Sequence, residues 1–250
     1  MQPDVSAVLK RLSITEQPIG FYDAPDPAPF KPLVVPGSGQ CVFASLKKWR
    51  EGKTLHLTRE KPGCGGGILL GVGGMSREEQ VAFLCDEEGL RADRELMNLW
   101  LDSAKSYRPA HEHLLIGPLR ADQYEYLRSV TFYVNADQLA VLCMGASYYS
   151  RPDDVPPVLA PFGSGCMQLI TLFDDLDLPQ AIIGATDHSL RNNLEPWMIA
   201  FSVTRPMFER LCRWGDDSRS SLHSGFTDKL IQARGGSLAK GCGSTALPPE

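Results

Sequence analysis

The stretch Val130-Thr-Phe-Tyr-Val-Asn135-Ala-Asp-Gln138 decides the fold class of this chain of 250 residues. Its first five residues are β-branched or aromatic, which is typical of a buried strand. Asn135 and Gln138 then fit a capping box, in which each side chain bonds the other residue's backbone N–H. We therefore expect a helix over 139–149. A strand that passes directly into a helix indicates an α+β or α/β protein.

The rest of the chain continues this mixture of elements. Further strands are expected over 54–58, 114–117, 181–185 and 198–203, and further helices over 41–49, 76–84, 91–107 and 206–214. The helix over 76–84 is expected to begin with a second capping box, formed by Ser76 and Glu79. Residues 1–20 are expected to form an amphipathic helix, and the proline-rich residues 23–39 an extended connector. The sequence thus predicts a mixed sheet with interleaved helices, although it does not give the strand order.

We expect one domain over residues 1–215, followed by a polar Gly/Ser-rich tail over 216–250. A short helix over 228–233 is the element expected in that tail. Within the domain, two pseudo-repeats are predicted at about 33–75 and 130–175, because one cysteine pattern occurs in both.

That pattern is C-x2-A-S-x17-G-C, and it places four of the seven cysteines. Cys41 leads to Cys64 at the same spacing at which Cys143 leads to Cys166. A match at fixed spacing favours an internal duplication with a pseudo-twofold axis. In such a protein four sulfurs can meet at one point, as a tetrahedral zinc ion or an iron–sulfur cluster requires.

The spacing favours an iron–sulfur cluster over zinc, because structural zinc sites usually take close C-x2–4-C pairs. Glycines beside two of the cysteines would let backbone N–H groups approach a bound cluster; they are Gly63, Gly65, Gly66, Gly67 and Gly165. The leading hypothesis is an iron–sulfur protein with a role in electron transfer or small-molecule reduction. One [4Fe–4S] cluster would be held by Cys41, Cys64, Cys143 and Cys166.

Two alternatives stay open. The chain could be a small-molecule binding protein with structural cysteines, or a thiol enzyme in which Cys64 is the nucleophile and His188 its base. Asp187, His188 and Arg191 follow a predicted strand, where α/β proteins often collect polar groups, so they are candidate catalytic residues. A cap and a surface turn would explain the same three residues.

His111 and His113 form a weaker pattern. They lie on one side of an expected extended segment, an arrangement that a metal ion can use. A pair just before a strand is, however, more often exposed to solvent.

Composition limits the classes of partner. The formal net charge of −5 argues against a nucleic-acid-binding surface, and no apolar run is long enough for a membrane span. The N-terminal residues lack the pattern of a signal peptide, so a cytoplasmic location is expected. The small-molecule substrate or redox partner is not identified by the sequence, and a homodimer is left open.

Several blocks occur in a characteristic order. They are Gly63-Cys-Gly-Gly-Gly-Ile-Leu-Leu-Gly71, Ile116-Gly-Pro-Leu119, Phe132-Tyr-Val-Asn-Ala-Asp-Gln-Leu139, Pro161-Phe-Gly-Ser-Gly-Cys166 and Ile183-Gly-Ala-Thr-Asp187. Over residues 15–215 the chain resembles the family of domains of unknown function numbered 169, the uncharacterised ArCR proteins. The resemblance implies a single-domain cytoplasmic protein, and it brings no activity and no catalytic residues.

Overall fold

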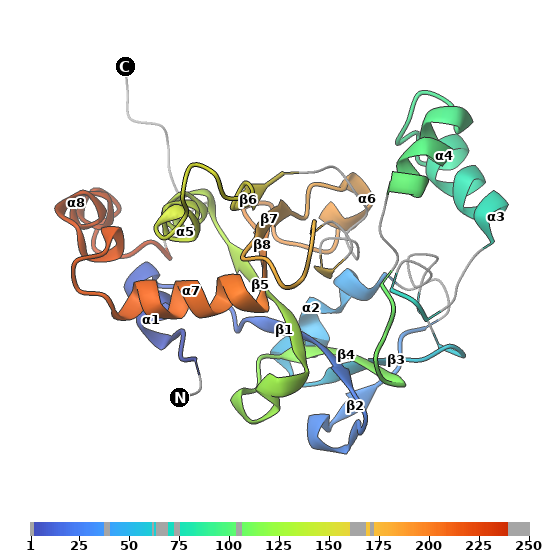
Figure 1. Ribbon diagram of the computed structural model, residues 1–250, viewed down its shortest axis with the longest axis horizontal. Helices are drawn as coiled ribbons and strands as arrows, with labels where there is room; N and C mark the ends of the chain where they lie inside the picture. Colours follow the sequence, from blue (N-terminus) through green and yellow to red (C-terminus); the bar gives the residue numbers. More distant parts are fainter. Residues whose placement is uncertain are drawn as a thin grey trace.

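The computed structural model describes residues 3–37, 41–61, 63, 70–72, 76–103, 107–160, 169–170 and 173–239. In this part of the chain one mixed sheet has the strand order β2-β3-β4-β1-β5-β8-β7-β6 (Figure 1). The strands are β1 (Ile19–Ala24), β2 (Leu33–Val34), β3 (Thr54–Leu57), β4 (His113–Pro118), β5 (Leu127–Val134), β6 (Val158–Leu159), β7 (Ala181–Gly184) and β8 (Ile199–Thr204).

The α-helices are α1 (Ser6–Leu12), α2 (Leu46–Arg50), α3 (Arg77–Val81), α4 (Arg94–Ser103), α5 (Ala136–Ser147), α6 (His188–Arg191), α7 (Arg205–Asp216) and α8 (Gly225–Ala233). The π-helical segment η4 (Ala82–Glu87) follows α3, and the 3-10 segments are η1 (Ala28–Phe30), η2 (Val42–Ser45), η5 (Ala121–Tyr126) and η7 (Ser221–His223). The predicted α+β class, with a mixed sheet and interleaved helices, is confirmed. Both predicted capping boxes are also present, at Ser76 and at Asn135.

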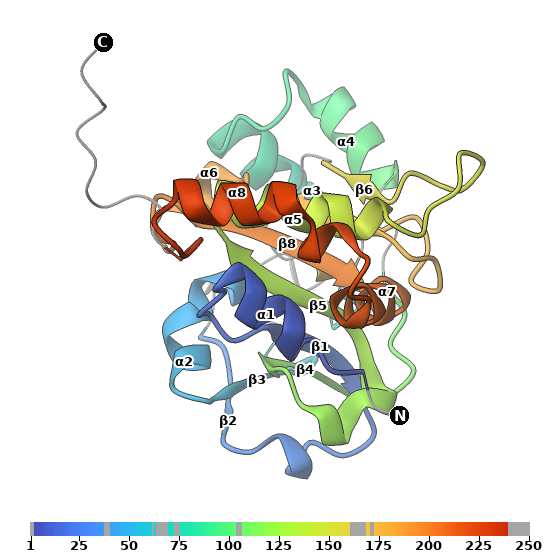
Figure 2. The same cartoon turned by 90° about the vertical axis from the view of Figure 1, so that its left-hand side faces the viewer.

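The sheet has a hydrophobic core on each face. We call the side that carries α1, α5, α7 and α8 the α1 face, and Figure 2 shows these helices in front of the strands. Phe132 and Phe201 on this face pack with Phe208 and Trp214 of α7. We call the opposite side, which carries α2 and α6, the α2 face. Its separate core includes Phe21, Ile116, Tyr133, Trp49 and Leu169.

The predicted helix over 1–20 is wrong in its second half. The helix α1 ends at Leu12, and the chain then enters β1 at Ile19. All six residues of β1 are buried, because β1 lies near the centre of a sheet that is covered on both faces. Such a strand shows no alternation of polar and apolar residues, so periodicity does not reveal it.

The strand order reads the same from both edges of the sheet. One half runs β2-β3-β4-β1 and the other β6-β7-β8-β5, each with a parallel edge pair followed by antiparallel pairs. The strands β1 and β5 join the halves in antiparallel fashion. The internal duplication itself stays a prediction, but the topology shows which segments would correspond.

The cysteine spacing does not follow this topology. Cys41 lies between β2 and β3, whereas Cys143 lies on α5, between β5 and β6. The edge strands β2 and β6 begin a different match, Leu33-Val-Val-Pro-Gly-Ser-Gly-Gln-Cys41 and Val158-Leu-Ala-Pro-Phe-Gly-Ser-Gly-Cys166. By strand order, the counterpart of Cys41 is therefore Cys166.

The segment after Gly215 adds to the core on the α1 face. Leu222 and Leu238 are buried there, and Leu230 and Ile231 of α8 pack against the same core. Among the described residues, no helix has the length and apolar character that crossing a bilayer requires.

The packing of α5 on α7 gives a prediction for stability. A Cβ added at Gly145 would lie 2.7 Å from a ring carbon of the buried Trp214. We expect overpacking in Gly145→Ala to lower the free energy of unfolding by about 1–3 kcal/mol. The higher helix propensity of alanine should offset about 0.5–1 kcal/mol of this loss. Gly225→Ala in α8 is the matched control, because its Cβ would meet nothing within 4 Å. Equal unfolding midpoints for the two variants in urea would contradict this packing.

Candidate functional site

The cluster hypothesis of four convergent cysteines is wrong. Cys41 packs against the core on the α2 face, whereas Cys143 packs against the core on the α1 face, so the sheet separates them. The described residues also contain no group of three or more His, Cys, Asp or Glu side chains that could hold a metal ion. The hypothesis of an iron–sulfur protein with one four-cysteine cluster is therefore overturned.

Part of the predicted set lies outside the described residues, namely Cys64, Cys166, Gly65, Gly66, Gly67 and Gly165. Gly63 is described and has a positive φ of 87°. Burial raises the pKa of the Cys143 thiol, which keeps this cysteine protonated at neutral pH. A protonated, half-buried thiol on α5 is typical of a structural cysteine.

The candidate residues after β7 have different surroundings. Asp187 is buried, and the side chain of His188 lies outside the described part of the structure. Arg191 donates hydrogen bonds to the backbone carbonyls of Ala185, Pro196 and Met198. Its guanidinium therefore ties the end of β7 to the start of β8, while a catalytic role for Asp187 and His188 stays a prediction.

The structure contains a buried carboxylate that sequence reasoning missed. Asp23 in β1 is 0 % exposed and lies on the α2 face, two residues beyond Phe21. Its Oδ2 accepts hydrogen bonds from the Tyr107 hydroxyl at 2.5 Å and the Ala110 N–H at 2.7 Å. Its Oδ1 accepts from the His111 N–H at 2.9 Å and from His111 Nδ1 at 3.2 Å.

A buried charge is costly unless donors or an opposite charge satisfy it. Four hydrogen bonds satisfy Asp23, and the Arg128 guanidinium lies 4.0 Å away. Burial and the neighbouring Asp23 carboxylate raise the pKa of Tyr107, so its hydroxyl remains a donor. The Asp23 carboxylate thus fixes the segment 107–111 over the sheet.

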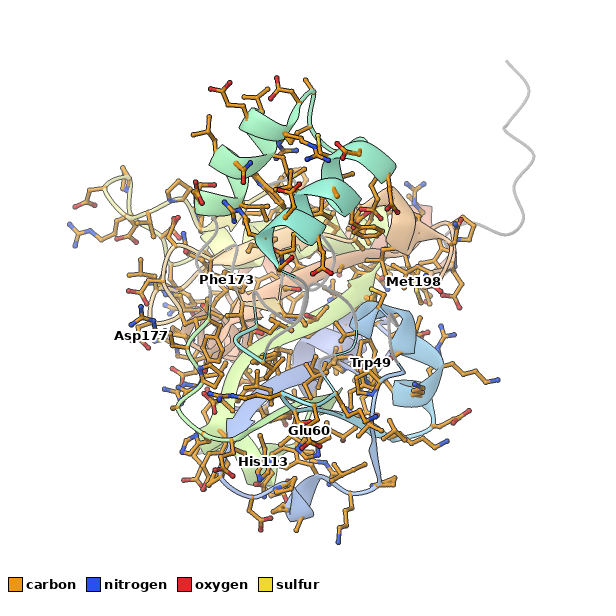
Figure 3. All side chains as sticks on the ribbon, turned by 90° about the vertical axis from the view of Figure 1, so that its right-hand side faces the viewer. Trp49, Glu60, His113, Phe173, Asp177 and Met198 are labelled. Atoms are coloured by element: carbon orange, nitrogen blue, oxygen red, sulfur yellow. The ribbon has the colours of Figure 1, made fainter. Side chains whose placement is uncertain are left out.

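This segment borders a cavity of about 580 Å³. The lining residues are Thr58, Arg59, Glu60, Gly71, Val72, Pro109, His111, Glu112 and His113. Figure 3 looks onto the α2 face and shows Glu60 and His113, two of the lining residues, at one end of that face. Gly71 is required where the lining meets this segment, because its φ is 77° and an added Cβ would lie 2.5 Å from the Tyr107 carbonyl oxygen.

His111 contacts Asp23 and is also one of the residues that line the cavity. An ionised carboxylate only accepts hydrogen bonds, so Nδ1 carries the proton that Asp23 accepts. In neutral His111 the other ring nitrogen, Nε2, is then an acceptor, and the side chain is 32 % exposed. A carboxylate that orients an imidazole in this way stabilises the imidazolium that forms when Nε2 takes up a proton.

The two histidines that the sequence placed together have different partners in the structure. His111 bonds Asp23, whereas His113 Nδ1 lies 3.0 Å from Nε2 of His56 in β3. The His56 and His113 rings meet edge to face, with centroids 5.0 Å apart. His111 and His113 therefore have different hydrogen-bond partners, although both line the cavity.

Comparison with known proteins gives one match. The family described as uncharacterised ArCR, DUF169, matches residues 9–213, which is most of the chain. No curated protein and no solved structure matches the chain.

The His56–His113 contact predicts a dependence of stability on pH. Burial and the neighbouring His113 lower the pKa of His56, so the unfolded chain binds the His56 proton more readily. Stability from this contact is present above the ordinary histidine pKa of about 6.5 and is lost as the pH falls below it. We expect the free energy of unfolding to fall more between about pH 7 and pH 5 in the wild type than in His56→Gln. Identical pH profiles from urea unfolding would refute this coupling.

Proposed function

We propose that this chain, which belongs to the uncharacterised ArCR family DUF169, binds a small polar molecule in the cavity beside His111 and exchanges a proton with it. The observation that carries the proposal is that His111 both bonds the buried Asp23 carboxylate and lines the cavity. The same residue thus contacts a buried acidic side chain and a space that a ligand can enter.

The size and lining of the cavity support a small polar ligand. Pockets for small molecules commonly have volumes of about 300–1,000 Å³, and this cavity falls within that range. Its lining combines the Arg59 guanidinium with the carboxylates of Glu60 and Glu112. Groups of both charge signs suit a ligand that has hydrogen-bonding or charged groups of its own.

The reaction class that fits His111 is proton transfer. As a general base, neutral His111 would take a proton from the bound molecule at Nε2, while Nδ1–H remains hydrogen-bonded to Asp23. The Asp23 carboxylate would stabilise the resulting imidazolium, and its hydrogen bonds with Tyr107 and Ala110 would hold it in place. The proton would return from Nε2 to the product in the reverse step.

A thermal-shift screen tests this proposal. The purified chain would be incubated with a panel of small carboxylic acids, amines and amino acids. We expect at least one compound to raise the melting temperature of the wild type, because a ligand that binds the native state stabilises it. Loss of a hydrogen bond to a charged ring should weaken binding of that compound about tenfold or more in His111→Gln.

The matched control is His223→Gln, because His223 contacts the Gly215 carbonyl near α7 and does not line the cavity. Its affinity for the compound should equal that of the wild type. The proposal fails if no compound stabilises the wild type, or if His111→Gln binds the compound as tightly as His223→Gln does.

A further inference from the structure

Residues 76–103 form a helical hairpin with its own small core. The segments α3 and η4 pack against α4 through Val81, Leu84, Met97 and Leu101. Figure 1 shows the hairpin projecting from the body of the protein, beyond α2 and α6. Its hydrophobic core is separate from both cores of the sheet, so this unit presents most of its outer surface to solvent.

The outer surface of α4 carries two exposed leucines. Leu96 is 46 % exposed and Leu99 is 59 % exposed, whereas Met97 and Leu101 are buried in the hairpin core. Residues three apart lie next to each other on a helix, so the two leucines form one apolar strip, which we call the α4 strip. A single exposed leucine is ordinary, whereas these two form a small continuous apolar patch on a projecting helix.

The hairpin is strongly acidic. It contains eight carboxylates (Glu78, Glu79, Asp86, Glu87, Glu88, Asp93, Glu95 and Asp102) and three arginines (Arg77, Arg91 and Arg94). The hairpin therefore has a net charge of −5, which equals the net charge of the whole chain. The rest of the chain contains equal numbers of acidic and basic residues. The acidity that appears as a property of the composition is therefore concentrated in one projecting unit.

The three arginines are engaged within the hairpin. Arg77 pairs with Asp102, and Arg94 pairs with Glu78 and Asp86. Arg91 lies over the Trp100 ring, 4.8 Å from its centroid. Glu95, next to Leu96, is exposed and has no ion pair among the described residues, so the border of the α4 strip attracts positive charge.

We infer that the α4 strip docks a basic amphipathic helix of a partner protein. Its apolar side would cover Leu96 and Leu99, and its lysines or arginines would face exposed Glu95 and be attracted by the net negative charge of the hairpin. A second copy of this chain fits less well, because it would bring the same negative charge to the contact. The same charge disfavours nucleic acid and anionic membranes.

Fluorescence anisotropy on the full chain tests this inference. The probe is a labelled synthetic helix with leucine on one face and lysine on the other. We expect it to bind the wild type and to dissociate as salt rises. Loss of both apolar contacts in Leu96→Ser/Leu99→Ser should weaken binding by about tenfold or more.

Two controls make the result specific. Phe226→Ser removes a more exposed apolar side chain, 82 % exposed on α8, and should leave the affinity unchanged. A peptide with glutamate in place of every lysine should not bind. Equal affinity of the double variant and Phe226→Ser would overturn the inference, as would equal binding of the two peptides.

Self-association gives a further decisive outcome. If analytical ultracentrifugation finds a wild-type dimer that Leu96→Ser/Leu99→Ser abolishes, a second copy covers the strip and the inference is wrong. An unchanged circular dichroism spectrum and melting temperature of the double variant would show that the hairpin still folds.

Discussion

The Asp23 carboxylate is the constraint on which the candidate site depends. It is fully buried in β1, near the middle of the sheet, where an unsatisfied charge would be too costly to keep. The donors that satisfy it, from Tyr107, Ala110 and His111, all belong to the segment that precedes β4. Satisfying the charge therefore orders this segment, and ordering the segment places His111 at the cavity. The same hydrogen bonds of Asp23 therefore stabilise this segment and position the histidine that is proposed to exchange a proton.

The sheet explains why one face carries this site. The α1 face is closed by α1, α5 and α7, whose large apolar residues, such as Phe208 and Trp214, fill the space above the strands. The α2 face has shorter helices, and polar side chains lie beneath them: Ser129 donates to the Leu169 carbonyl, and the Thr131 and Ser202 hydroxyls lie 2.8 Å apart. Polar groups of the central strands are therefore satisfied on the α2 face either by each other, as Thr131 and Ser202 are, or by segments outside the sheet, as Ser129 and Asp23 are.

The sequence predicts those features of the structure that local interactions determine. The capping boxes at Ser76 and Asn135 locate the starts of α3 and α5, because both partners lie within one helical turn. Asp23 could not be found in this way, since its partners Tyr107 and His111 are 84 and 88 residues away. The cysteine spacing misled for a related reason: equal spacing in sequence does not imply equivalent places in a sheet, and the sheet separates Cys41 from Cys143. Local sequence also does not give the partners of His111 and His113: both line the cavity, but His111 bonds Asp23 and His113 contacts His56, which are distant in the chain.

The tautomer of His111 tests the central claim most directly. Long-range ¹H–¹⁵N correlation spectra of the histidine rings, recorded at about pH 8 where an ordinary histidine is neutral, distinguish a proton on Nδ1 from one on Nε2. The account predicts that His111 carries its proton on Nδ1, held by Asp23, and that Asp23→Asn removes this preference. A proton on Nε2 in the wild type would contradict the account, because Nε2 of neutral His111 would then be a donor and could not accept a proton from a ligand.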